Sequence, residues 1–276
     1  MRVLIGIVGG TGKMGAFFHK VFEKAGWDVM ISGRATAVTS RDLASVCDVL
    51  MVSVPIRETV HVVRTLAPLL YEDQVFCDLT SIKTGPVEAM LASNAQVVGF
   101  HPMFGPTVQS LSGQAIVATP ARCEQEILER ILGVFRSQGA TVTLSTPKEH
   151  DRIMAVVQGL THFVTLSLAE TMRRVGVRPQ DTMAFMSPVY QMEMGLVGRL
   201  LSQDPSLYAD ILELNPHVPP VLEACEKSLA SIRKIVEAQD TGAFEKVFRE
   251  NSLHFGEYCE TAARESDMLI AAMVKR

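Results

Sequence analysis

Residues 3–15 read Val-Leu-Ile-Gly-Ile-Val-Gly-Gly-Thr-Gly-Lys-Met-Gly, an aliphatic run that passes directly into a cluster of glycines. The run over Val3–Val8 predicts a buried strand, and the apolar residues at helical spacing after the glycines predict a helix. Gly10, Gly12 and Gly15 fit the pattern GxGxxG between that strand and that helix. In this pattern the first glycine permits a tight turn, the second lets a pyrophosphate approach backbone N–H groups, and the third lets the helix pack on the strand. The stretch therefore predicts a dinucleotide-binding α/β sheet.

Strand-like and helix-like runs alternate through the first half of the chain. Further strands are expected at 29–32, 48–54, 75–78, 96–100, 115–118 and 141–144. Helices are expected at 57–70 and 124–138, and another helix is expected to end at about residue 92. This alternation is typical of a doubly wound parallel sheet with helices on both faces. After Thr146-Pro147 only helical periodicities continue. We therefore predict a Rossmann-type doubly wound parallel sheet over residues 1–147, followed by an all-helical domain over residues 148–276.

The composition excludes several classes of protein. Apolar residues make up 47% of the chain, and a net charge of −4 gives no electrostatic reason to expect nucleic acid or an anionic membrane as a partner. No apolar stretch approaches the ~20 residues that a membrane helix requires. The five scattered cysteines, free of CxxC or Cys/His spacings, indicate a reducing compartment and no metal site. We expect a cytoplasmic protein with a small-molecule substrate.

The residues after the second expected strand bear on the choice of cofactor. An NAD site usually has an acidic residue here for the ribose diol, but this chain has Gly33-Arg34. A small residue followed by an arginine leaves room for a 2′-phosphate and supplies a cation for it, which favours NADP. Arg34 stacked on the adenine or pointing to solvent would leave NAD open. The expected cofactor-binding residues are Gly10, Thr11, Gly12, Lys13, Met14, Gly33, Arg34, Ser53, Val54 and Pro55.

A histidine stands where the fifth expected strand meets a proline- and glycine-rich loop, in Gly99-Phe100-His101-Pro102-Met103-Phe104-Gly105-Pro106. Ligands bind outside the carboxyl ends of the strands in such sheets, so His101 is the candidate general base. Ser81 and Lys83 follow the fourth strand on the same side. For these two, a helix cap and a solvated loop cation are the structural alternatives.

The helical half offers further candidates and a candidate interface. His162 lies in the first helix of that half, where a satisfied core histidine is the alternative, and His150 resembles a domain-junction residue. Arg199 stands among Leu, Val and Gly, where it either pairs with Glu193 or Asp204 or clamps a substrate carboxylate. Stripes rich in Met and Leu are typical of a core and a subunit interface, so we expect a homodimer through this domain.

These motifs together resemble the prephenate dehydrogenase family of tyrosine biosynthesis, most closely the dehydrogenase part of the chorismate mutase/prephenate dehydrogenases. The similarity covers nearly the whole chain, and its specific parts are the stretch 99–106 and Gly198-Arg199 through Gln203-Asp204-Pro205-Ser206-Leu207-Tyr208-Ala209-Asp210-Ile211.

The resemblance implies oxidative decarboxylation of prephenate, with His101 as the catalytic histidine on the ring hydroxyl and Arg199 on a substrate carboxylate. It also implies that Ser81 and Lys83 line the site and that His162 faces the substrate or the nicotinamide. The chain lacks chorismate mutase helices and a regulatory domain, so we expect neither mutase activity nor feedback through such a domain.

Other interpretations stay open. Arogenate dehydrogenase performs the same oxidation on an amino-acid analogue, and one contact to an amine or a keto group would decide between the two substrates. A deazaflavin-linked NADP oxidoreductase suits the glycine turn and Gly33-Arg34 but leaves His101 and Arg199 unexplained. A non-enzymatic NADP sensor would bind cofactor without turnover, and His101→Asn would then change no activity.

Overall fold

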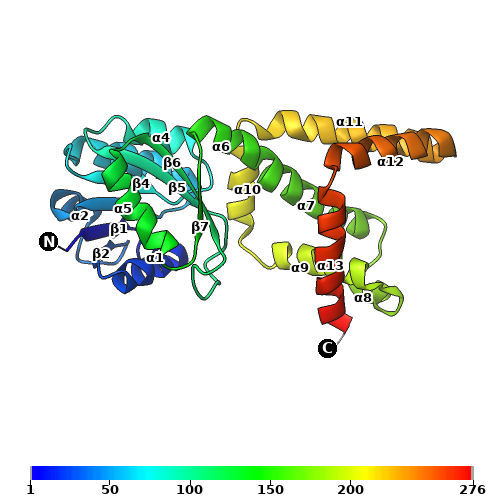
Figure 1. Ribbon diagram of the computed structural model, residues 1–276, viewed down its shortest axis with the longest axis horizontal. Helices are drawn as coiled ribbons and strands as arrows, with labels where there is room; N and C mark the ends of the chain where they lie inside the picture. The colour runs from blue at the N-terminus through cyan, green and yellow to red at the C-terminus, as the bar shows by residue number, and fades with distance from the viewer. Residues whose placement is uncertain (1, 275–276) are drawn as a thin grey trace. The chain divides into compact units, whose positions relative to one another are not determined.

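The computed structural model describes residues 2–274 and divides them into two compact units (Figure 1). The sheet unit contains the residues up to Ala155 together with Ser206–His217, and the helical unit contains Val156–Pro205 and the residues from Val218 on. Ser206–His217 is therefore a segment from the second half of the chain that belongs to the sheet unit. Arg57 holds this segment by ion pairs to Asp210 and Glu213.

The sheet unit follows the predicted alternation. Its elements are β1 (Leu4–Val8), α1 (Lys13–Lys24), β2 (Asp28–Ser32), α2 (Ser40–Val46), β3 (Val49–Val52), α3 (Ile56–Leu66), η1 (Ala67–Leu69), β4 (Val75–Asp78), α4 (Thr84–Met90), β5 (Gln96–Pro102), β6 (Ala115–Arg122), α5 (Gln125–Arg136), β7 (Thr141–Leu144), α6 (Pro147–Met154) and α10 (Pro205–Glu213). Helix α2 was not predicted. Thr39 caps it in a reciprocal capping box with Asp42, a local signal that a search for apolar periodicity passes over.

The seven strands form one sheet in the order β2-β1-β3-β4-β5-β6-β7. All neighbours are parallel except β5 and β6, which are antiparallel, so the predicted parallel sheet is confirmed with one reversed pair. This pair also extends β5 beyond its predicted end at Phe100. His101 pairs with Val117 and Pro102 with Ile116, so His101 is the penultimate residue of the strand and does not follow it.

Two apolar cores cover the two faces of the sheet. One contains Ile5 and Ile7 of β1 with Phe18 of α1 and Phe135 of α5. The other gathers buried side chains of α2, α3 and α4 against the opposite face, among them Leu43, Val63 and Met90. Burial on both faces explains why the strands are almost uninterrupted apolar runs. It also leaves the carboxyl ends of the strands as the place where polar groups can gather.

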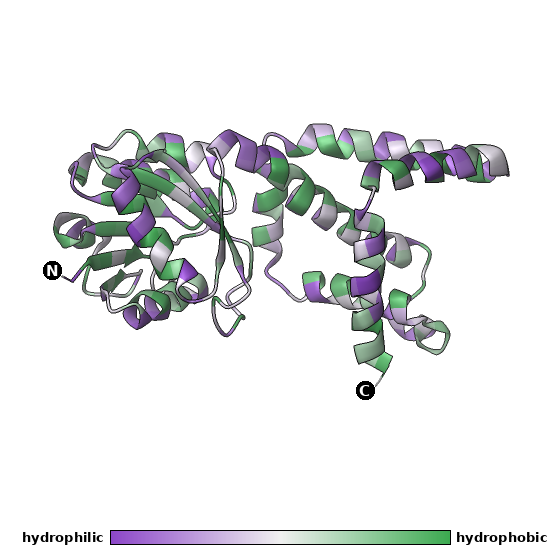
Figure 2. Cartoon of the chain, viewed as in Figure 1, coloured by the Kyte–Doolittle hydropathy of each residue, from purple (hydrophilic) through white to green (hydrophobic). Residues whose placement is uncertain are grey.

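The helical unit contains η2, a π-helix (Ala155–Leu160), α7 (Thr161–Arg174), α8 (Pro179–Thr182), η3 (Met183–Phe185), α9 (Pro188–Leu201), α11 (Val218–Glu237), α12 (Thr241–Phe255) and α13 (Tyr258–Val274). No strand occurs in the described part of this unit, as predicted. Many large apolar side chains on its helices are exposed, including Leu253 at 81%. Figure 2 shows that apolar residues recur along these helices. Helices α11, α12 and α13 line an apolar cavity of about 570 Å³.

Within residues 2–274, one helical run is long and apolar enough to cross a membrane by length and composition, Pro147–Arg174. The sequence analysis did not predict it, because charged and polar residues interrupt the apolar stretch. An apolar helix that packs in a soluble protein passes the same test.

Candidate active site

The turns after β1, β2 and β3 contact one another at the carboxyl edge of the sheet. The backbone N–H of Gly9 donates to the carbonyl of Ser32 over 2.8 Å. A Cβ added to Gly33 would lie 2.3 Å from Oγ1 of Thr11, and one added to Gly9 would lie 2.2 Å from the carbonyl oxygen of Ser53. The three segments that the sequence assigned to cofactor binding are therefore brought together. These are 10–14, 33–34 and 53–55.

The glycine turn itself fits a dinucleotide phosphate. A Cβ at Gly10 would lie 2.6 Å from Ile31, and one at Gly15 would lie 2.5 Å from the carbonyl oxygen of Gly9, so packing requires both glycines. A Cβ at Gly12 would meet only the carbonyl oxygen of Gly9, at 3.2 Å. Gly12 is the N-cap of α1 and provides no side-chain cap for its first N–H groups. These N–H groups are the donors that a pyrophosphate uses at a helix N-terminus.

Arg34 lies in the turn after β2, directly after Gly33, and its side chain is exposed. The preceding turn is fixed locally, because the N–H of Gly33 donates to Oγ1 of Thr36 over 2.8 Å. No salt bridge holds Arg34 within the described part of the chain. Its guanidinium therefore has the freedom that a contact with a 2′-phosphate requires.

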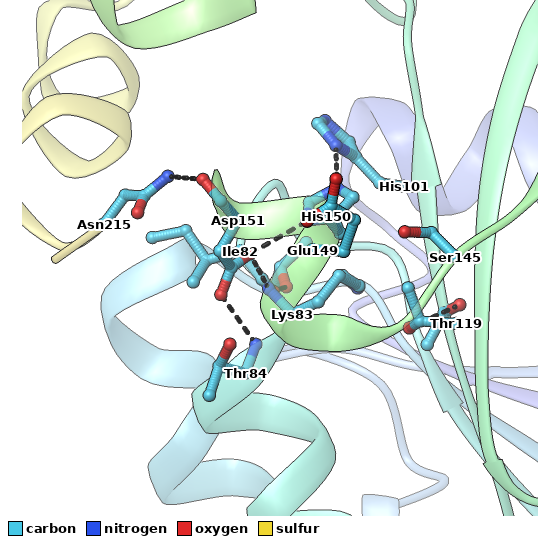
Figure 3. Close-up of polar contacts among 12 residues, drawn as sticks. Ile82, Lys83, Thr84, His101, Thr119, Ser145, Glu149, His150, Asp151 and Asn215 are labelled. Carbon is cyan, nitrogen blue, oxygen red and sulfur yellow. Dashed lines mark hydrogen bonds and ion pairs between the residues drawn. The ribbon is translucent and has the colours of Figure 1, made fainter. Parts of the chain in front are cut away.

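His101 is buried beside a second histidine that comes from α6 (Figure 3). Its Nδ1 lies 2.8 Å from Nε2 of His150, and each residue is only 2% exposed. Burial lowers the pKa of His101 well below its ordinary value, and the nearby His150 and Lys83 lower it further, while Asp151 acts in the opposite direction. The imidazole of His101 is therefore neutral at physiological pH, as a proton acceptor must be.

Asp151 continues this chain of contacts into the core. Its Oδ1 lies 2.8 Å from Nδ1 of His150, and the backbone N–H groups of Lys83 and Thr84 donate to its two carboxylate oxygens over 2.8 Å each. Burial raises the pKa of Asp151, but the hydrogen bonds from His150, Thr84 and Lys83 together outweigh burial and hold the pKa below its ordinary value. Asn215 fixes the same turn by donating to the carbonyl of Asp151 over 2.8 Å. The carboxylate is thus ionised and held from several sides.

The sequence analysis gave His150 no functional role. It treated each histidine singly, and a histidine next to an aspartate at the start of a helix resembles a junction residue. The available signal was the dipeptide His150-Asp151 itself, because a carboxylate beside an imidazole fixes which ring nitrogen carries the proton.

Lys83 is completely buried and is therefore not a solvated loop cation. Its Nζ donates to Oδ2 of Asp78 over 2.5 Å and to the carbonyl of Phe100 over 2.7 Å. The side chain crosses β5 at Gly99, where a Cβ would lie 2.9 Å from Cδ of Lys83. Burial lowers the pKa of Lys83, and the carboxylates of Asp78 and Asp151 oppose that shift. A contact between this amine and a substrate anion stays a prediction, and the geometry favours a role in fixing β5 beneath His101.

Two family models match the chain. The nucleotide-binding domain of prephenate dehydrogenase matches residues 29–144, and the prephenate dehydrogenase dimerization domain matches residues 146–250. The T-protein of Haemophilus influenzae is 32% identical over 268 residues, which cover 96% of this chain and 70% of that protein. The chain belongs to the prephenate dehydrogenase family.

Other relatives agree with this assignment. A protein of Methanocaldococcus jannaschii, described as a probable arogenate/prephenate dehydrogenase, is 33% identical over 291 residues, 99% of this chain and 65% of that protein. The chain thus spans about two thirds of the length of these relatives. In fold it is similar to the crystal structure of prephenate dehydrogenase from A. aeolicus in complex with hydroxyphenyl propionate and NAD+. The TM-score is 0.71 at 22% identity, with 93% of this chain and 99% of that one covered.

The remaining candidate site residues of this prephenate dehydrogenase family member are divided between the two units. Ser81 lies half-buried in the loop between β4 and α4, at the same sheet edge as His101. His162 lies on α7, where burial lowers its pKa, and Arg199 lies on α9 with an exposed side chain. Arg199 is therefore not a buried charge that needs a structural partner. His162 and Arg199 belong to the helical unit, and their approach to His101 stays a prediction.

Proposed function

We propose that the protein catalyses the oxidative decarboxylation of prephenate to 4-hydroxyphenylpyruvate and CO2 in tyrosine biosynthesis, with hydride transfer to a nicotinamide cofactor. The observation that carries the proposal is the buried, neutral His101 at the carboxyl edge of the sheet in a chain of this family. The cradle formed by the turns after β1, β2 and β3 lies at the same edge.

The reaction needs a base and a hydride acceptor. His101 takes the proton of the ring hydroxyl while hydride leaves the carbon that bears that hydroxyl. A nicotinamide cofactor held by the turns after β1, β2 and β3 would supply the hydride acceptor. The resulting dienone loses CO2, because the electron pair of the broken carbon–carboxylate bond restores the aromatic ring. His101 then returns its proton to the phenolate oxygen. General base catalysis of this kind is worth about 10²- to 10⁴-fold in rate.

The other candidate residues have roles on the substrate side of the proposal. Arg199 binds a substrate carboxylate through two parallel hydrogen bonds, the geometry that a guanidinium fork provides. Ser81 and His162 face the substrate or the nicotinamide. Ser81 belongs to the sheet unit, whereas His162 and Arg199 belong to the helical unit.

NADP is the proposed cofactor, and NAD is the alternative. The exposed Arg34, next to a glycine where an NAD site usually has a carboxylate, supports this choice. Hydrogen bonds to charged groups contribute about 1.5–3 kcal/mol, so Arg34→Ala should raise the KM for NADP by about ten- to a hundredfold. The KM for NAD should stay nearly unchanged. Equal losses with both cofactors would contradict a contact with the 2′-phosphate.

A homodimer through the helical unit is also proposed. The match to a dimerization domain and the exposed apolar side chains of α11, α12 and α13 support it. Arogenate stays the alternative substrate, because its amine replaces a keto group on a side chain for which no contact is assigned.

The experiment that tests the proposed function crosses prephenate and arogenate with NAD and NADP and follows the absorbance of the reduced nicotinamide. Wild-type protein should turn over prephenate, and His101→Asn should lose at least about a hundredfold in kcat with little change in KM. Turnover of arogenate alone would identify arogenate as the substrate and leave the proposed mechanism unchanged. No turnover in all four combinations would refute both dehydrogenase assignments.

A further inference from the structure

We infer that His150 and Asp151 form a positioning pair that fixes the tautomer of His101 and shares the proton that His101 takes from the substrate. The inference rests on the proposed function, because it concerns the base of that reaction. Neither residue is a catalytic residue in this scheme, since both act through His101. The two contacts that carry it are shown in Figure 3 and measure 2.8 Å each.

The direction of each hydrogen bond follows from the carboxylate at the end of the chain. An ionised carboxylate only accepts, so Nδ1 of His150 carries a proton and donates it to Asp151. A neutral imidazole has a single N–H, so Nε2 of His150 is an acceptor and Nδ1 of His101 donates to it. The lone pair of His101 is therefore placed on Nε2, the nitrogen on the opposite edge of its ring. This is the tautomer that a base facing the substrate requires.

Asp151 is unusually well suited to hold this arrangement. Its two oxygens already accept the backbone N–H groups of Lys83 and Thr84 at the start of α4. These bonds keep it ionised and prevent its carboxylate from rotating away from His150. Its carbonyl is fixed separately by Asn215. The orientation of His150 is thus determined by α4, α6 and the segment after α10.

The pair also compensates for the burial of His101. A positive charge formed on a ring that is 2% exposed is costly, and the ammonium of Lys83 makes it costlier. When Nε2 of His101 takes the substrate proton, the bond from its Nδ1 to His150 becomes charge-assisted. The Nδ1 proton can then move to His150, which places the positive charge next to Asp151. When the phenolate forms, His150 returns this proton to Nδ1 of His101, and Nε2 of His101 releases its proton to the phenolate oxygen.

The test compares two variants of His150 with a remote control. His150→Leu removes the partner of His101, whereas the side-chain oxygen of His150→Gln can still accept from Nδ1 of His101 but cannot take up a proton. His61, exposed on α3, provides the control His61→Leu. Each variant is assayed with prephenate and NADP for kcat and both KM values, and its fold is checked by the fluorescence of Trp27.

The expected result is a split between kcat and KM. His150→Leu should lower kcat by about a hundredfold and change KM by less than about threefold, since the pair acts on the proton and not on substrate binding. His150→Gln should recover part of kcat, and His61→Leu should match the wild type. A folded His150→Leu variant with wild-type kcat would overturn the inference, as would equal losses in the Leu and Gln variants.

A second readout does not depend on turnover. In protein labelled with ¹⁵N-histidine, long-range nitrogen–proton couplings identify the protonated nitrogen of each ring, and the signals are assigned with His101→Asn and His150→Gln. The inference requires His101 protonated on Nδ1 in the wild type and a mixture of tautomers in His150→Leu. Protonation on Nε2 in the wild type would overturn it. If the wild type oxidises neither substrate, the proposed function fails, and this readout still decides on the positioning pair.

Discussion

Replacement of Lys83 by methionine is the sharpest test of how the site is supported. Lys83 is fully buried, and its Nζ bonds to Asp78 over 2.5 Å and to the carbonyl of Phe100 over 2.7 Å. Methionine has a similar length and no charge. In Lys83→Met the buried Asp78 would keep only the donors of Thr80, at 2.9 Å and 2.6 Å, and the carbonyl of Phe100 would lose the bond from Nζ.

Breaking a buried ion pair by removing one partner costs about 3–5 kcal/mol, because the other charge stays buried without compensation. We therefore expect Lys83→Met to lower the free energy of unfolding of the sheet unit by about 3–5 kcal/mol. The double variant Lys83→Met/Asp78→Leu should recover a large part of the lost free energy of unfolding, since no uncompensated charge remains. Lys20→Met, at an exposed position of α1, should stay within about 0.5 kcal/mol of the wild type.

The assay is unfolding in guanidinium chloride followed by tryptophan fluorescence. Trp27 is the single tryptophan, and its ring centroid lies 5.1 Å from that of Phe22 in the core of the sheet unit. The signal therefore reports the unit that contains Lys83. A loss below about 1 kcal/mol, combined with a tenfold rise in the KM for prephenate, would refute the structural role and favour a substrate-binding lysine.

Three further outcomes follow from particular residues. In the same unfolding assay, Gly99→Ala should destabilise the sheet unit by about 1–3 kcal/mol, because the new Cβ would lie 2.6 Å from Oγ1 of Thr119. The control Gly105→Ala has open space around its new Cβ and should stay within about 0.5 kcal/mol of the wild type. Burial lowers the pKa of His101 below its unfolded value of about 6.5, so the unfolded state binds more protons than the folded state below that pH. The free energy of unfolding should therefore fall as the pH drops below about 6.5, and this fall should be smaller in His101→Asn. Leu253→Glu places a charge on an 81% exposed apolar position of α12, and light scattering should show a shift from dimer to monomer if this face is the subunit interface.

Most of the fold could be predicted because it depends on local patterns. The glycine turn and the alternation of strands and helices identify the sheet, and its order places the carboxyl ends of β1, β3, β4 and β5 along one edge. The reversal of β6 could not be predicted, since nothing in an apolar run encodes the direction of its neighbour. That reversal extends β5 through His101, which is buried, whereas the sequence placed this residue where the strand meets a loop.

The supporting residues could not be predicted because their partners are distant in the chain. His150 meets His101 across 49 positions, and the backbone of Lys83 meets Asp151 across 68. The sequence left Lys83 as either a site residue or a solvated loop cation, because a lysine in a loop after a strand is usually solvated. Its burial depends on Gly99, whose missing side chain leaves room for the lysine to cross β5.

The contacts around His101 involve buried charged side chains whose charges do not fully balance. Asp78 and Asp151 are both 0% exposed, and the ammonium of Lys83 balances one of them at Asp78. The cluster therefore retains one excess negative charge, on Asp151, when both histidines are neutral. A proton taken up by His101 neutralises that excess, because the chain of hydrogen bonds leads from His101 through His150 to Asp151. The negative charge on Asp151 thus offsets part of the cost that burial and the ammonium of Lys83 impose when His101 becomes charged.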